Sequence, residues 1–144
     1  MRHRSYSGKV LYITDGKGEM GREMFYVTIQ PDGTRTLRAT CEMDDDRLLR
    51  DVVITLDDTW RPLDAFVRLT IQEAFSGVAW FRFTDTLAEC EAYTAKEGRI
   101  SQTFQTPSHA VSLGTHPVHS DAWGLARFKA RKPGDEVETT GLNF

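Results

Sequence analysis

Strict alternation of apolar and polar residues within Arg61–Phe83 constrains the fold of this chain more than any other feature. Apolar residues recur at every second position over Leu63–Ile71 and, except for Gly77, again over Phe75–Phe83, with Phe66 as an apolar exception on the opposite face. Successive side chains of a strand point to opposite faces of a sheet. The stretch therefore predicts two β-strands, each with one buried face, joined by a tight turn.

The same pattern continues on both sides of this hairpin. Turn signals such as Asp15-Gly16 and Pro31-Asp32-Gly33 separate the apolar stretches, since proline presets φ and glycine accepts a positive φ. With the hairpin, this predicts eight strands, the other six being residues 6–14, 22–30, 34–43, 48–56, 87–95 and 99–105. Short strands joined by hairpin turns are typical of a mainly β, antiparallel up-and-down meander.

A meander of this kind removes its exposed edges by curling or by covering them. We therefore expect a barrel or half-barrel that resembles the lipocalins in architecture, although the chain lacks their glycine-x-tryptophan signature and is assigned to no family. The alternation stops at Thr106-Pro107, and residues 106–119 are predicted to form a loop. Ser120-Asp121 then begins a predicted helix of residues 120–131, because serine caps a helix and an acid suits its first turn. Residues 133–144 are predicted to be a loose tail of the same single domain, 1–144.

Composition narrows the classes of partner. A net charge of −3 and a pI of about 5.8 give no general attraction to nucleic acid or anionic membranes, so neither is expected as a partner. No apolar run approaches the ~20 residues of a membrane helix. Polar residues follow the basic N-terminus where a signal peptide has an apolar core, which predicts a cytoplasmic protein. Cys41 and Cys90 fall within strands and are predicted to be buried and reduced.

Two motifs are better explained as turns than as sites. The segment Gly16–Gly21 matches G-x-G-x-x-G, but a dinucleotide site needs a helix after it, and the residues from Glu23 to Ile29 alternate like a strand. A flexible hairpin loop is the favoured interpretation. The run Asp44–Asp46 lacks the glycine and the distal glutamate of a calcium loop, so we interpret it as a solvated turn.

Three of the four histidines, His109, His116 and His119, lie close together before Asp121. Histidine titrates near neutral pH and a neighbouring carboxylate can orient it, so His116 or His119 with Asp121 are the candidate catalytic residues. Imidazole and carboxylate could also bind a metal ion, but the spacing is not that of a H-E-x-x-H helix, and no metal or cofactor is predicted. The favoured alternative is structural: loop residues that hydrogen-bond the backbone or cap the helix.

Charged and aromatic side chains on the strands form a second candidate site. Opposite charges on adjacent strands ordinarily stabilise a solvent-facing sheet. If part of that face lines a cavity, an arginine would suit a carboxylate or phenolate on a ligand, and aromatic residues would line an apolar pocket. The candidate ligand-binding residues are Tyr26, Arg38, Arg68, Trp80 and Phe81.

These residues support two main hypotheses about function. The first is a binding protein that carries a small hydrophobic or aromatic molecule. The second is a cofactor-independent isomerase, cyclase or lyase that uses a histidine as its acid–base in the same cavity. A protein–protein interaction module is a third possibility, and a homodimer is left open. Binding of a small molecule is common to the first two hypotheses.

Overall fold

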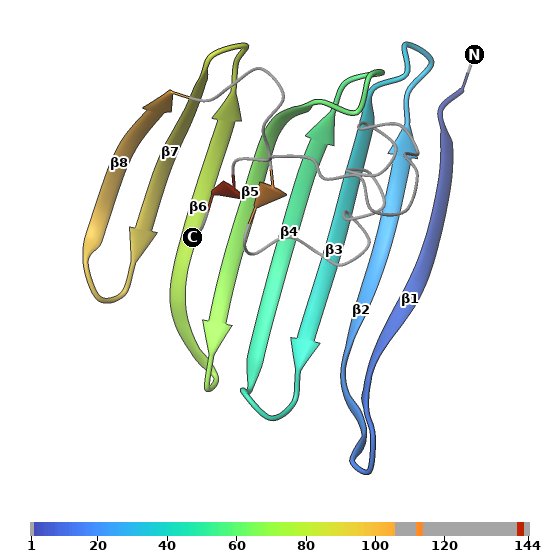
Figure 1. Cartoon of the computed structure of the whole chain (residues 1–144), viewed down its shortest axis with the longest axis vertical. Helices are drawn as coiled ribbons and strands as arrows, with labels where there is room; N and C mark the ends of the chain where they lie inside the picture. The colour runs from blue at the N-terminus through green and yellow to red at the C-terminus, as the bar shows by residue number, and fades with distance from the viewer. Residues whose placement is uncertain (1, 106–111, 114–140, 143–144) are drawn as a thin grey trace, which may run out of the picture.

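The structure, a computed structural model, describes residues 2–105, 112–113 and 141–142. Eight of its strands form one antiparallel sheet in which each strand pairs with the next along the chain (Figure 1). They are β1 (Arg4–Thr14), β2 (Gly18–Ile29), β3 (Arg35–Met43), β4 (Leu48–Leu56), β5 (Pro62–Ile71), β6 (Ala74–Phe83), β7 (Leu87–Thr94) and β8 (Gly98–Gln105). The predicted eight-stranded meander is confirmed, and the predicted bounds of the fourth strand are those observed.

The sheet is open within the described residues, because β1 pairs only with β2 and β8 only with β7. The lipocalin-like barrel therefore stays a prediction. The predicted helix 120–131 lies outside the described residues. Part of the predicted loop, β9 (Ser112–Leu113), pairs in parallel with part of the predicted tail, β10 (Gly141–Leu142). No helix of the described residues is both long and apolar enough to cross a membrane.

One face of the sheet forms the core. Its fully buried side chains come from β2 to β7 and are mostly small or β-branched, as strands with one buried face require. Cys41 and Cys90 belong to this face as free thiols, which confirms the prediction for both. The core comprises Val27, Leu37, Ala39, Val52, Ile54, Leu56, Ala65, Val67, Ala79, Phe81, Phe83, Ala88, Cys90 and Ala92.

Two bulges correct the predicted alternation of the central hairpin. The pairing register shifts between Thr55 and Leu56 and again between Leu69 and Thr70. A bulge adds one residue to one strand, so side chains beyond it point to the opposite face. Leu63, Ile71 and Phe75 were predicted on the same face as the core residues, and all three are exposed. Leu63 is the inserted residue of the first bulge and Phe75 lies beyond the second, whereas Ile71 keeps the phase of the core and is exposed at the end of β5.

The turns explain a further correction. In the hairpin between β1 and β2, Gly16 has φ +78° and Gly18, with φ +84°, already begins β2. The predicted flexible loop over Gly16–Gly21 is therefore wrong from Gly18 onward, where the chain is already strand. No helix follows it, so the arrangement of a dinucleotide site is not present in this segment.

Candidate functional site

A row of polar side chains crosses the buried face at its β1–β4 side. Glu23 on β2 lies opposite Cys41 on β3, and Cys41 lies opposite Arg50 on β4. Each is two or four positions from a core residue of its own strand, so all three share the core face. Glu23 is 0% exposed. A buried carboxylate is costly unless donors reach it, which makes its surroundings informative.

Two hydroxyl or thiol donors reach the same oxygen of Glu23. The Tyr12 hydroxyl donates to Glu23 Oε2 at 2.9 Å, and the Cys41 thiol donates to that oxygen at 3.4 Å. Tyr12 comes from β1, where a register shift after it distorts the pairing with β2. Its partner on β2 is Gly21, where a Cβ would overlap the carbonyl oxygen of Glu42. Tyr12, Glu23, Cys41 and Arg50 are called the polar cluster below.

Both donors of the polar cluster keep their protons at neutral pH. The pKa of Tyr12 is raised far above its usual value, first by burial and then by its hydrogen bond to Glu23. Burial also raises the pKa of the Cys41 thiol, and the neighbouring Arg50 guanidinium opposes that shift. A protonated thiol is a weak nucleophile. Cys41 therefore acts here as a hydrogen-bond donor, and the arrangement does not support covalent catalysis by this cysteine.

Arg50 is the member of the polar cluster with an unmatched donor. Its Nε is buried and has no hydrogen-bond partner among the described residues. Native structures leave few buried N–H groups unsatisfied, so each such group calls for an explanation. The guanidinium group presents its donors in a planar fork that matches a carboxylate. Arg50 is therefore suited to hold an anionic group at the core face.

The same row continues from Arg50 into a hollow of the buried face. Leu69 on β5 lies opposite Arg50, Gly77 on β6 lies opposite Leu69, and Thr94 on β7 lies opposite Gly77. Small residues leave space here, and the hollow has a volume of about 440 Å³. That is within the range of small-molecule pockets, ~300–1,000 Å³. Leu69, Gly77, Cys90, Ala92, Thr94 and Ile100 are among its lining residues.

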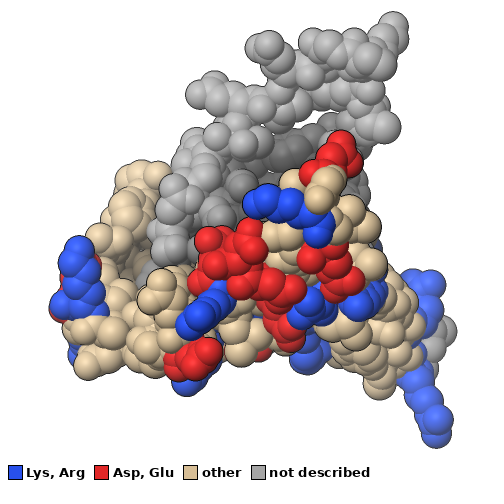
Figure 2. Space-filling view, turned by 90° about the horizontal axis from the view of Figure 1, so that it is seen from below, with Lys and Arg blue, Asp and Glu red and all other residues tan. Residues whose placement is uncertain are grey.

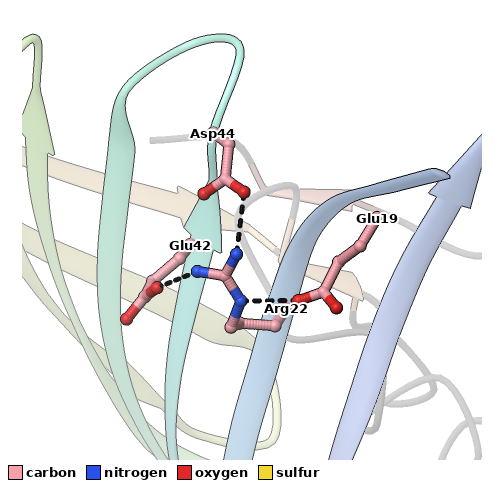
Figure 3. Close-up of polar contacts among 4 residues, drawn as sticks. All are labelled: Glu19, Arg22, Glu42 and Asp44. Carbon is pink, nitrogen blue, oxygen red and sulfur yellow. Dashed lines mark hydrogen bonds and ion pairs between the residues drawn. The ribbon is translucent and has the colours of Figure 1, made fainter. Parts of the chain in front are cut away.

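The face of the sheet opposite the core face is called the open face below. A second charged group lies at one end of it and has a structural role. The Arg22 guanidinium contacts Glu19 at 2.8 Å, Glu42 at 2.5 Å and Asp44 at 2.7 Å (Figure 3). It thereby ties β2 to β3 and to the turn after β3. Acidic side chains gather at this end of the sheet with basic ones beside them (Figure 2), and Lys17 contacts Asp45 at 3.8 Å. Within the described ranges no group of three His, Cys, Asp or Glu side chains is placed to hold a metal ion.

The predicted ligand-binding residues do not form one site. Tyr26, Arg38, Arg68 and Trp80 lie on the open face, while Phe81 is buried on the core face. Arg38 donates to Thr28 Oγ1 at 3.3 Å, and the Arg68 guanidinium lies 5.2 Å from the centre of the Phe75 ring. The sheet brings Tyr26 opposite Arg38, but it separates both from Phe81.

The predicted catalytic residues His116, His119 and Asp121 lie outside the described residues, as does His109. The sequence did not point to Tyr12, Glu23 or Arg50 as site residues. The signal that could have found two of them is a charged residue in phase with core positions, as Glu23 is with Val27 and Arg50 is with Val52 and Ile54. Comparison of the chain with family models, with curated proteins and with solved structures found no match to any of them.

Proposed function

We propose that this protein binds a small anionic organic molecule on the core face of its sheet. Arg50 holds the carboxylate or phenolate of that molecule, and the hollow beside Leu69 and Gly77 takes its apolar body. The observation that carries the proposal is the buried, unpartnered Nε of Arg50 in a row that leads directly into this hollow. The sequence predicted a hydrophobic or aromatic ligand, and the proposal adds an acidic group to that ligand.

Energetics favour an acceptor at this position. A buried N–H without a partner costs about 1–3 kcal/mol, which an oxygen acceptor on a ligand would recover. A carboxylate can accept two parallel bonds from a guanidinium group, so its geometry adds orientation to the affinity. Adjacent strands are about 4.8 Å apart. An anionic group at Arg50 and a ring over β5 and β6 therefore fit a molecule of one or two rings.

The neighbouring groups would select against other ligands. The Tyr12 and Cys41 donors are already directed at Glu23, so they are not offered to a second anion. The Glu23 carboxylate, two strands from Arg50, repels an anion that lies on its side of the row. The ligand is thereby directed from Arg50 toward the hollow rather than toward β1.

Carriage and catalysis share this binding step. Conversion of the ligand by an isomerase, cyclase or lyase mechanism rests on His116, His119 and Asp121. Closure of the site by a half-barrel and a C-terminal helix rests on residues beyond β8. Binding is the part of the function for which the described residues supply contacts. We therefore propose a binding protein, with acid–base catalysis by those residues as its alternative.

A matched pair of probes tests the proposal. Naphthalene-2-carboxylate and its amide have the same shape, but only the first is anionic. Calorimetric titration should show that the wild-type chain binds the carboxylate at least ~10-fold more tightly than the amide, because a charge-assisted bond is worth about 1.5–3 kcal/mol. In Arg50→Met this preference should disappear.

Arg99→Met is the control, since Arg99 is exposed on β8 and contacts Glu91 at 3.3 Å. It should bind both probes as the wild type does. Equal binding of the carboxylate by the wild type and by a folded Arg50→Met variant would contradict the proposal, and so would binding of neither probe. Native mass spectrometry of the purified chain, compared with its denatured mass, would show an organic ligand retained from the cell.

A further inference from the structure

The open face of the sheet carries a patch of large side chains that face solvent. Met24 and Tyr26 on β2, Phe66 on β5, Trp80 on β6 and Tyr93 on β7 are each between 39% and 53% exposed. Phe66 and Trp80 are direct partners across β5 and β6. We call these five residues the aromatic patch. Arg38 on β3 and Val53 on β4 lie in the same row between Tyr26 and Phe66. Single exposed apolar residues are ordinary, but several large ones on one face mark an interaction site.

Two shallow hollows lie on either side of Phe66 on this face. Phe66 lines both of them. One hollow, of about 350 Å³, reaches toward Tyr26 and Val53, and the other, of about 460 Å³, reaches toward Trp80 and Tyr93. A partly exposed ring beside a shallow hollow is self-complementary, because the Phe66 of a second copy can lie in the hollow next to the first.

The charges around the patch are nearly balanced. In the three rows of the open face that pass through Met24, Tyr26 and Thr28, β1 to β8 carry four arginines, one lysine (Lys9) and four acids. Opposite signs face each other across strands, as in Asp51 opposite Arg68, and Arg99 contacts Glu91 at 3.3 Å. The arginines are Arg38, Arg68, Arg82 and Arg99, and the acids are Asp51, Asp64, Glu89 and Glu91.

This balance identifies the kind of partner. Nucleic acid binding depends on a basic surface that neutralises phosphates, and a face whose acids nearly balance its cations does not provide one. A face that interleaves both signs can instead match a copy of itself, since a two-fold axis places each patch against the identical patch. The charges thus favour a second copy of this chain.

The available area agrees with a dimer. Side chains of this size carry roughly 150–250 Å² each, so the exposed part of the five amounts to roughly 350–550 Å². A stable interface buries about 800 Å² on each partner. The aromatic patch would supply about half of that as an apolar centre, and the stems of the surrounding arginines would supply a polar rim, which is the usual anatomy of an interface.

We propose that the chain forms a two-fold symmetric dimer through the open face of its sheet, with the aromatic patch at the centre and Phe66 of each copy in a hollow of the other. The ligand proposed above lies on the core face, so the dimer does not depend on it. The two sheets would pack face to face about 10 Å apart, as in β-sandwiches.

Sedimentation of the full chain between roughly 1 and 100 µM tests this proposal, because interfaces of this size have affinities of micromolar or tighter. The wild type should sediment as a dimer. Trp80→Ser and Phe66→Ser should each raise the dissociation constant roughly 10-fold or more, since central aromatic residues dominate interface affinity. Both positions are exposed, and circular dichroism would verify that the variants are folded.

Ile13→Ser is the matched control, because Ile13 is exposed on the β1–β2 hairpin away from the patch. It should dimerise like the wild type. A wild type that stays monomeric over the whole range would overturn the proposal, and so would folded Trp80→Ser and Phe66→Ser variants that dimerise unchanged. A monomer whose tryptophan fluorescence is quenched by a single-stranded RNA oligonucleotide would also overturn it and assign the face to nucleic acid.

Discussion

Replacement of Tyr12 by phenylalanine isolates one hydrogen bond of the polar cluster. The ring stays in place, so no cavity forms, and only the hydroxyl that donates to Glu23 Oε2 at 2.9 Å is lost. The acceptor is a fully buried carboxylate. Hydrogen bonds to charged groups contribute about 1.5–3 kcal/mol. Because Tyr12 itself is only half-buried, water can partly replace its hydroxyl, and we expect a loss of about 1.5–2 kcal/mol in the free energy of unfolding.

Urea unfolding followed by circular dichroism measures this loss. The midpoint should fall while the slope with urea stays unchanged, because the exposed surface of the unfolded chain is the same. Tyr93→Phe is the control: Tyr93 is exposed on the open face and should lose less than about 0.5 kcal/mol. Equal losses in the two variants would refute the reasoning, since they would show that the hydroxyl of Tyr12 contributes nothing through Glu23.

Two further predictions follow from the same region. The pKa of Tyr12 is higher in the folded state than the unfolded value of about 10, so its contribution to stability is complete below pH ~10 and is lost as pH rises above it. Urea unfolding at pH 8 to 11 should therefore show a steeper alkaline loss of stability for the wild type than for Tyr12→Phe. Parallel curves for the two proteins would exclude this role. Gly21→Ala should lower the free energy of unfolding by about 3 kcal/mol, because its Cβ would overlap the Glu42 carbonyl oxygen and backbone cannot easily yield. Ser7→Ala on β1 is the control and should lower it by less than about 0.5 kcal/mol. An equal urea midpoint for the two variants would contradict the overlap.

Most of the fold was predictable because local sequence determines it. Most hairpins of the meander are closed by a turn that glycine, proline or aspartate indicates, and the alternation gives the strands between them; the Gln72-Glu73 turn between β5 and β6 carries no such signal. Asp57 illustrates this: its Oδ1 accepts from the Thr59 amide at 2.8 Å and from the Arg61 amide at 2.9 Å, which fixes the turn before β5. Bulges were not predictable, because one extra residue leaves the composition of a strand unchanged while it reverses the face of Phe75.

The polar cluster was harder to find for a different reason. Glu23 and Cys41 are 18 residues apart, and only the pairing register of β2 with β3 brings them together. In the sequence, a single acid or arginine within an apolar stretch resembles the solvent-facing residues beside it. Conversely, Tyr26, Arg38, Arg68 and Trp80 share the open face, whereas Phe81, directly after Trp80, belongs to the other face because successive side chains of a strand alternate. The proposed roles of His116, His119 and Asp121 stay predictions.

The pairing of each strand only with its sequence neighbour has a consequence for how the chain folds. In the sheet of eight strands every pairing joins strands that follow each other in the sequence, so the entropy lost on loop closure is small at each step. The β5–β6 hairpin has the shortest connection, two residues, Gln72 and Glu73, both with positive φ. It can form first and add one strand at a time on either side. A sheet assembled in this order folds faster than all-β proteins in which the first and last strands must pair.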